Sequence, residues 1–236
     1  VGSLMFGKSG DDTITGNSTS DQIIYGGAGA DVIDAKGSSN GDSVFGGAGN
    51  DTIKVTVATG DSSYDGGDDT DTLDYSGLGS AATFVVGADS IAVSQGSGSN
   101  VSAENFEYVT GSDNGDTFTL TGDTSTNALE TITAGTGNDT FTGTLAEFDG
   151  DVIADFTDGD VIDLSDVDLT QSMVSVSESG GITTIEIDTN GDGTPDASLD
   201  LAGTFPNGDF TVAPDGTLSF VPITAVDLTG TPGDDN

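Results

Sequence analysis

The sequence predicts an all-β protein in which the chain winds into a stack of parallel β-coils. Aromatic residues recur every 19 or 20 residues, at Phe6, Tyr25, Phe45 and Tyr64. Each of them lies beside a glycine-rich loop that ends in aspartate. A fixed period of this length is the signature of a solenoid, because each coil stacks on a copy of itself.

The composition indicates that this stack depends on a bound cation. The chain of 236 residues has 41 Asp plus Glu against three lysines, and its formal net charge is −38. Only 33% of the residues are hydrophobic, so a thick apolar core is hard to build. Self-repulsion of this size opposes a compact state, and we therefore expect order that is conditional on a ligand.

Several functional classes are disfavoured by the same composition. All three lysines (Lys8, Lys36 and Lys54) lie in the first quarter of the chain, so we expect no nucleic-acid partner, since phosphate binding needs clustered Lys or Arg. The chain has no cysteine to form disulfides, and its apolar runs are too short for a transmembrane helix.

Catalysis has little residue chemistry to use. Without His, Cys or Arg, the chain cannot build a Ser-His-Asp triad, a thiol nucleophile or a zinc site. Two-carboxylate glycoside hydrolysis is compatible with the residues present, but a close pair among 41 acids is uninformative. We predict that the chain is not an enzyme.

Each repeat unit consists of six loop residues ending in Asp, followed by three residues with a large apolar residue at the centre. The glycines supply the positive φ angles of tight turns, and the three-residue run is a short strand. Two units make one flattened coil, and the central residues point inward between two parallel sheets. In the first array these inward residues are Ile14, Ile23, Ile33, Val44, Ile53 and Leu73.

The units GGAGADVID (26–34) and GGAGNDTIK (46–54) resemble the RTX (repeats-in-toxin) family, whose motif is GGxGxDxUx with U large and apolar. The motif is specific here because several copies run in tandem. The resemblance implies a parallel β-roll in which Asp carboxylates and loop carbonyls of turns one coil apart share calcium ions. The cofactor expected is therefore Ca²⁺, bound at several sites.

Alternate turns of such a roll lie on opposite edges. One edge is expected to carry Asp12, Asp31, Asp51 and Asp71, and the other Asp21 and Asp42 followed by a poor match around Asp61. We expect one well-occupied calcium ladder and one partial ladder, whose loops are closed instead by Ser, Thr and Asn hydrogen bonds. The four aromatic residues are expected to form a packed stack along the roll.

The same resemblance implies further ligands in the loops of the first array, through their carbonyl oxygens. These residues are Gly7, Ser9, Gly10, Gly26, Gly27, Ala28, Gly29, Gly46, Gly47, Ala48, Gly49, Gly66, Gly67 and Asp68. A metal-free solenoid is disfavoured, because carboxylates repeated at a strand spacing of about 4.8 Å would repel one another strongly.

Beyond the first roll (residues 1–74), we predict a β-insertion at 75–110 and a second roll at 111–165. In the second roll Asp116, Asn127 and Asp139 take the Asp-equivalent place, Gly135 and Gly137 lie in a loop, and Phe118, Leu129 and Phe141 point inward. Asn127 still offers a neutral oxygen, at the cost of charge. Asp151 and Asp160 fall where the two edges would continue.

The C-terminal part is predicted to close the roll. Residues 149–167 resemble the closing segment of RTX rolls in serralysin-type proteins, and 166–222 are expected to form a β-hairpin cap with an acidic loop. Residues 223–236 are interpreted as a linker and the start of a further repeat, so we expect the chain to be a segment of a longer protein.

The acidic loop of the cap has oxygen-bearing residues at EF-hand-like spacing, at Asp188, Asn190 and Asp192, with Asp196 beyond them. Leu199 stands where an EF-hand needs its bidentate Glu, and the flanking segments are predicted strands. We predict an isolated hairpin calcium loop. The alternative is a solvated turn closed by Asx hydrogen bonds.

These features favour a secreted, calcium-stiffened structural module of a surface layer (S-layer), filament or adhesin that self-associates. The RTX resemblance implies type I secretion from a Gram-negative bacterium. The alternative is an accessory domain of a secreted protease, lipase or alginate epimerase. A weaker hypothesis is ice or glycan contact along a Thr-rich face, where Thr13, Thr52 and Thr72 recur but Val32 interrupts them.

Overall fold

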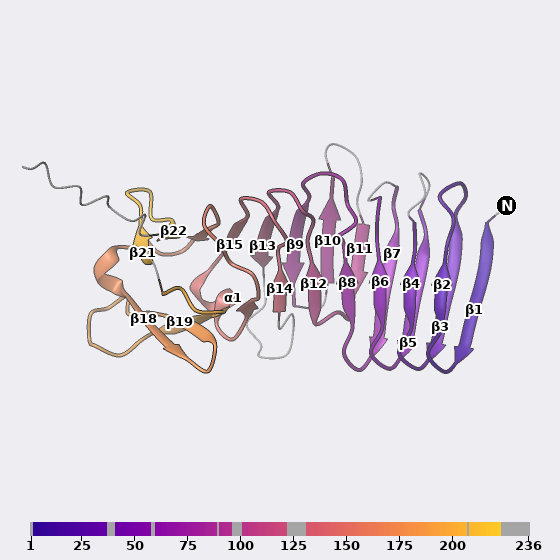
Figure 1. Ribbon diagram of the computed structural model, residues 1–236, viewed down its shortest axis with the longest axis horizontal. Coiled ribbons are helices and arrows are strands. Elements are labelled where there is room, and N and C mark those ends of the chain that lie inside the picture. The colour runs from indigo at the N-terminus through magenta and orange to yellow at the C-terminus, as the bar shows by residue number, and fades with distance from the viewer. Residues whose placement is uncertain are drawn as a thin grey trace, which may run out of the picture.

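The computed structural model describes residues 2–36, 41–57, 60–88, 90–95, 101–121, 131–206 and 208–222. Within these residues the strands form two sheets that face each other along an elongated parallel solenoid of about 7 turns (Figure 1). The all-β class and the parallel β-roll predicted from the repeats are confirmed.

The described strands are distributed over two sheets, here called sheet A and sheet B. Sheet A has 12 strands, in spatial order β1 (Ser3–Ser9), β3 (Gln22–Ala28), β5 (Ser43–Ala48), β7 (Ser63–Asp68), β11 (Val101–Glu104), β10 (Ser90–Ser94), β9 (Thr83–Gly87), β13 (Thr117–Thr121), β15 (Thr140–Gly143), β17 (Val161–Leu164), β22 (Leu218–Pro222) and β21 (Gly208–Val212). Sheet B has 10 strands, in spatial order β18 (Val174–Ser179), β19 (Ile182–Ile187), β20 (Ala197–Ala202), β16 (Val152–Ile153), β14 (Thr131–Thr133), β12 (Tyr108–Thr110), β8 (Thr72–Asp74), β6 (Thr52–Lys54), β4 (Val32–Asp34) and β2 (Thr13–Thr15). A helical turn, α1 (Leu145–Phe148), and a 3₁₀ turn, η1 (Gln171–Met173), complete the described elements.

In the first four coils, strands β1 to β8, the chain alternates between the two sheets with the same register from coil to coil. Ile33 pairs with Ile14 on one side and Ile53 on the other, and Ile53 pairs with Leu73. Ile33, Ile53 and Leu73 are fully buried, as the repeat pattern predicted. The parallel strands thus stack identical positions into a thin apolar filling.

Two positions in these coils differ from the prediction. Ile23 points outward and is 43% exposed, and its neighbour Ile24 is the buried residue, because the loop before β3 is one residue longer than the motif. Tyr64 leaves the aromatic stack and turns inward, since it pairs with Val44 while Asp65 pairs with Phe45. The other three rings stack as expected, with centroids 5.2 Å apart for Phe6 and Tyr25 and 4.9 Å for Tyr25 and Phe45.

Between β8 and β12 the chain adds three strands to sheet A, whereas sheet B passes directly from β8 to β12. Strands β9, β10 and β11 form an antiparallel meander, with β11 parallel to β7 and β9 parallel to β13. Large side chains fill the interior there, and the rings of Tyr75 and Phe84 meet edge to face at 5.4 Å. The division into two rolls and an insertion remains a prediction.

A three-stranded antiparallel ladder and an antiparallel hairpin lie at the C-terminal end of the solenoid (Figure 1). The β18–β19–β20 ladder joins sheet B through β16, and the β21–β22 hairpin joins sheet A through β17. The rings of Phe156, Phe205, Phe210 and Phe220 pack together beneath them. The similarity of this part to a serralysin-type closing segment remains a prediction.

Candidate metal centres

A row of aspartates follows the edge where the chain turns from sheet A to sheet B. Asp31 lies one coil above Asp12, and its Oδ1 accepts a hydrogen bond of 2.7 Å from the Asp12 backbone N–H. The same 2.7 Å bond recurs from Asp31 to Asp51, from Asp51 to Asp71, and from Asp71 to Oε2 of Glu107. One carboxylate oxygen per coil is therefore fixed by the neighbouring turn.

The second oxygen of each aspartate is buried and lacks a hydrogen-bond partner. This holds for Oδ2 of Asp12, Asp31, Asp51 and Asp71. A buried carboxylate oxygen without a partner costs free energy, and such groups are rare in folded proteins. Four of them in register indicate that another group belongs beside each one.

The first glycine of each loop lies against this oxygen. A methyl group added to Gly7 would stand 2.6 Å from Asp12 Oδ2 and 2.5 Å from the carbonyl oxygen of Gly26. Gly46 lies against Asp51 Oδ2 and the Gly66 carbonyl in the same way. Carboxylate and carbonyl oxygens thus converge on one small space per coil, and any side chain at the first glycine would fill it.

Later positions of the loops need residues that tolerate positive φ. Gly27 (φ 126°) and Gly29 (φ 127°) are examples, and Lys8 (φ 96°) and Asp69 (φ 83°) adopt the same conformation where a glycine would be less strained. This conformation gives the turn its tight path from one sheet to the other.

Burial makes the charged form of these carboxyl groups costly. The pKa of Asp71 is raised to about 7, chiefly by desolvation. The Asp51 N–H lowers this pKa, and the nearby carboxylates of Asp51, Glu107 and Asp69 raise it. The pKa of Asp51 is also raised, first by burial. A bound cation would reverse this effect, because it favours the ionised form.

The residues present fit calcium. In the part of the chain that the structure describes, no group of three carboxylates could by itself hold a metal ion. A site on this edge therefore needs backbone carbonyls besides one or two aspartates, and Ca²⁺ accepts such mixed oxygen sets. The turns supply these donors in each coil.

The opposite edge of the first coils, where the chain turns from sheet B to sheet A, is built differently. Its buried row is Gln22, Asp42 and Ser62, linked by bonds from Gln22 N to Asp42 Oδ1 (2.9 Å) and from Asp42 N to Ser62 Oγ (3.0 Å). Asp21, a predicted ligand, is exposed, and Gln22 takes its place in the row because of the extra loop residue.

Amide and hydroxyl groups close the first loop on this edge, as expected for a partial ladder. Gln22 Oε1 accepts from the Asn17 backbone N–H (2.6 Å), and Asn17 Oδ1 accepts from the backbone N–H of Thr19 and Ser20. A buried Gln was not anticipated. The signal for it was the seven-residue spacing from Gly16 to Gln22, one residue longer than the motif.

In the later coils the aspartate row lies on the edge where the chain turns from sheet B to sheet A. Asp116 Oδ1 accepts from Ala82 N (2.6 Å), Asp139 Oδ1 from Asp116 N (2.6 Å), and Asp160 Oδ1 from Asp139 N (2.8 Å). Of the three, Asp139 has a buried, unpartnered Oδ2, whereas Asp116 Oδ2 accepts from Ser112 N and Asp160 Oδ2 from Thr157 N. Burial raises the pKa of Asp139 to about 6, with Asp160, Asp116 and Asp155 adding to the shift.

The remaining predicted residues of the second roll are placed only in part. Asp151 lies before β16, on the edge where the chain turns from sheet A to sheet B. Asn127 and Leu129 fall outside the described residues. Ile132 is the buried residue of β14. Gly135 and Gly137 have positive φ, at 102° and 146°.

Asp155 and Glu107 were missed by the sequence analysis. Asp155 accepts hydrogen bonds from the N–H groups of Ala134 and Gly135, both at 2.7 Å, and burial raises its pKa. Glu107 directly precedes the strand Tyr108-Val109-Thr110. The available signal was its place before a three-residue run with a large apolar residue at the centre.

The acidic hairpin loop is closed by its own hydrogen bonds. The two carboxylate oxygens of Asp188 accept from Gly191 N (2.7 Å) and Gly193 N (2.8 Å), and Asn190 Oδ1 accepts from Asp192 N (2.8 Å). Asp196 accepts hydrogen bonds from the Thr189 hydroxyl and from Thr189 N (2.8 Å), and these bonds lower its pKa. These are the bonds of an Asx turn, and calcium binding by this loop remains a prediction.

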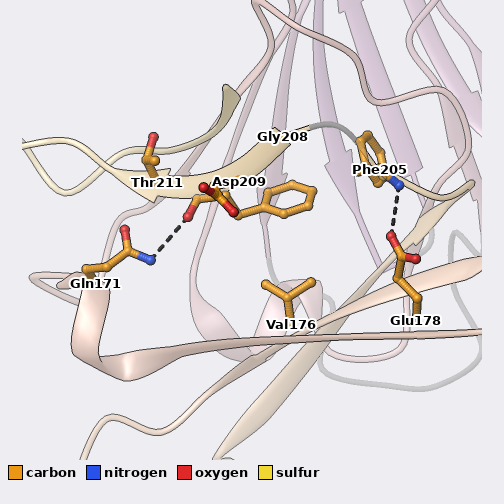
Figure 2. Close-up of a pocket in the computed structure, with 8 residues that line it drawn as sticks. Gln171, Val176, Glu178, Phe205, Gly208, Asp209 and Thr211 are labelled. Carbon is orange, nitrogen blue, oxygen red and sulfur yellow. Dashed lines mark hydrogen bonds between the residues drawn. The ribbon is translucent and has the colours of Figure 1, made fainter. Parts of the chain in front are cut away.

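A cleft of about 540 Å³ lies between η1, β18 and β21 (Figure 2). Its walls are tied together by Gln171, whose Nε2 donates to the Phe210 carbonyl (3.1 Å), and by Glu178, whose Oε1 accepts from Phe205 N (2.9 Å). Val176 lines its floor. The cleft contains none of the predicted site residues, and its polar groups join its walls to each other.

Comparison with known families agrees with this geometry. The model of the RTX calcium-binding nonapeptide repeat matches in 4 copies, at residues 6–40, 36–54 and 126–144. No curated protein matches the chain in sequence. The repeats, together with the parallel solenoid, fit an RTX β-roll protein, and calcium is the ion that such repeats imply.

No helix among the described residues is long and apolar enough to cross a membrane.

Proposed function

We propose that the chain is a non-catalytic, extracellular structural module that folds and stiffens when its loops bind calcium, as part of a surface layer, filament or adhesin. The observation that carries this proposal is the row of buried, unpartnered Oδ2 atoms of Asp12, Asp31, Asp51 and Asp71. A row of this kind serves to join the coils of strands β1 to β8 to one another, which is a mechanical role.

The protein's own residues prepare the sites. Asp31, Asp51 and Asp71 each bind the preceding coil through Oδ1, and the Oδ2 of every aspartate in the row faces the first glycine of its own loop. Calcium supplies positive charge and accepts several oxygen ligands at once. Without it, the carboxylates of adjacent coils repel each other at strand spacing, so calcium shifts the equilibrium toward the ordered roll.

The calcium concentration of the surroundings would then act as the folding signal. Extracellular oxygen-ligand modules bind calcium with Kd of about 10⁻⁴–10⁻³ M, which is far above cytosolic levels. Type I secretion from a Gram-negative bacterium fits this requirement, because the chain would stay loose during export and order outside the cell. The proposal therefore includes a secreted location.

A calcium titration followed by far-UV circular dichroism and thermal melting tests this function. We expect a smaller β signal and a lower melting temperature in EDTA, and a cooperative rise in both with millimolar calcium. At 10 mM calcium, a site with Kd of about 10⁻⁴–10⁻³ M adds about 1.4–2.7 kcal/mol to the free energy of unfolding. A chain stripped of calcium that kept its β signal and melting temperature would refute the proposal.

A matched pair of variants ties the effect to the buried row. Asp31→Asn keeps the Oδ1 acceptor but removes the charge beside the unpartnered oxygen, so we expect a weaker calcium midpoint. Asp21→Asn makes the same chemical change at an exposed position nearby and should leave the midpoint unchanged. Equal effects of the two substitutions would argue against a specific role of the buried row.

A further inference from the structure

The outer face of sheet A in the first three coils is apolar. Leu4 is 59% exposed and Phe6 58% on β1, and Ile23 is 43% exposed and Tyr25 39% on β3. The register aligns Leu4 with Ile23, and Phe6 with Tyr25 and Phe45. We call these five residues the β1–β3–β5 face. Contiguous apolar patches of this kind mark interaction sites on soluble proteins.

The aromatic part of this face is already stacked within the chain. The ring planes of Phe6 and Tyr25 differ by 8°, and those of Tyr25 and Phe45 by 10°. Rings stacked in this way cover one another's faces and present their edges outward. A sugar ring packs on an aromatic face, so the β1–β3–β5 face suits a protein surface better than a glycan.

The charges around the face indicate which protein surface it suits. No outward-facing residue of β1, β3 or β5 in the described structure is acidic, although the chain has 41 acids. Lys8 lies on β1, in the first coil, at one end of this face. Asp65 lies on β7, in the fourth coil, where it takes the next place after Phe45 in the aromatic row. The face is therefore free of like charge in the middle and carries opposite charges at its two ends.

We propose that two copies of the chain pack through their β1–β3–β5 faces, with their roll axes antiparallel. Reversal of one roll brings the coil with Lys8 in each copy over the coil with Asp65 in the other. The apolar residues of the two coils between these ends then lie over one another. Face-to-face sheet packing and twofold symmetry are both common in protein assemblies. This inference rests on the proposed structural function, and it names the surface through which the module would self-associate.

Sedimentation of the full chain in calcium tests the pairing. We expect a dimer for the wild type, and an increase of at least tenfold in the dimer Kd for Tyr25→Asp, which places a carboxylate in the centre of the face. Tyr108→Asp is the matched control, because Tyr108 is 37% exposed on sheet B. A wild-type chain that stays monomeric in calcium, or equal effects of the two substitutions, would overturn the proposal.

A charge exchange tests the antiparallel arrangement without altering the apolar residues. Lys8→Glu and Asp65→Lys should each weaken the dimer, and the double variant should restore it, since the opposite charges are regained with exchanged positions. Additive weakening in the double variant would refute the antiparallel packing.

Circular dichroism and the calcium midpoint, measured on every variant, separate this proposal from the function above. A chain that folds with calcium yet never dimerises loses only the proposed interface. A chain that ignores calcium loses the proposed function itself.

Discussion

The N-terminal coils (β1 to β8) and the C-terminal coils (β9 and β12 to β17) carry the same kinds of ladder in different places. In the N-terminal coils the aromatic ladder is outside, with Phe6 58% exposed, and the aspartates line the turns from sheet A to sheet B. In the C-terminal coils Phe84, Phe118 and Phe141 stack in the interior at 4.5 and 5.4 Å, and the aspartates line the opposite edge.

The number of unpartnered carboxylate oxygens also differs between these two sets of coils. Among the described residues, the N-terminal coils have a buried Oδ2 without a partner on Asp12, Asp31, Asp51 and Asp71, and the C-terminal coils have one on Asp139. Aliphatic residues and Tyr64 fill the N-terminal interior, whereas a stack of phenylalanines lies among the aliphatic residues of the other. The difference teaches that a thin roll can be held either by cations at its edge or by larger apolar side chains inside. We expect the N-terminal coils to depend more on calcium.

The largest expected effect is that of removing an interior ring. Phe118→Ala should lower the free energy of unfolding by about 3–5 kcal/mol, because Phe118 is fully buried between Phe84 and Phe141. Phe6→Ala removes an exposed ring and should cost less than about 1 kcal/mol in the monomer. Denaturant unfolding in calcium measures both values. Similar costs would contradict the contrast between the inner and outer ladders.

A substitution in the row of aspartates should change stability in opposite directions with and without calcium. With calcium, Asp51→Asn should lower stability by about 2 kcal/mol, through loss of a charged ligand. In EDTA it should raise stability, because burial raises the pKa of Asp51 and an amide avoids the buried charge while keeping the acceptor for Asp31 N. Thermal melts of the variant and the wild type in both conditions test this. Destabilisation in EDTA as well would contradict the interpretation.

The pH dependence of the calcium-free protein follows from the same carboxyl groups. The folded-state pKa of Asp71 is about 7 and that of Asp139 about 6, against an ordinary value of 3.8. The folded state therefore binds protons more tightly between pH 3.8 and these values, so its stability is highest at low pH and is lost as the pH rises through 6 to 7.

In EDTA the melting temperature should consequently rise as the pH falls from 7.5 to about 4.5. With saturating calcium the slope should reverse, because protons compete with the cation for the same oxygens. Melts across this range, with and without calcium, measure both slopes. The same slope in both conditions would show that these carboxyl groups do not bind calcium.

The period of the repeat was sufficient to predict the solenoid, the inward residues Ile33, Ile53 and Leu73, and the edge shared by Asp12, Asp31, Asp51 and Asp71. Prediction failed where a repeat unit departs from nine residues. One extra residue before β3 moved Ile23 outward and put Gln22 in the place of Asp21. A one-residue slip reverses every side chain of a strand, so a repeat model fails completely at such a point.

The move of the aspartate row to the other edge was harder to foresee. It depends on β9, β10 and β11 joining sheet A while the chain returns to sheet B at β12, which is a tertiary arrangement. The role of Asp155 has the same origin, because its partners Ala134 and Gly135 belong to the preceding coil. No local pattern contains that information.

The smallest expected effect concerns the acidic hairpin loop, which lies outside both sets of coils. Asp188→Ala removes the acceptors for Gly191 N and Gly193 N, and the unfolding free energy of the roll should change by less than about 1 kcal/mol, since these bonds are exposed. If the loop binds calcium, as its oxygen spacing predicts, the number of bound ions should fall by one. Equilibrium dialysis of the variant beside the wild type counts them, and an unchanged number would favour the Asx turn.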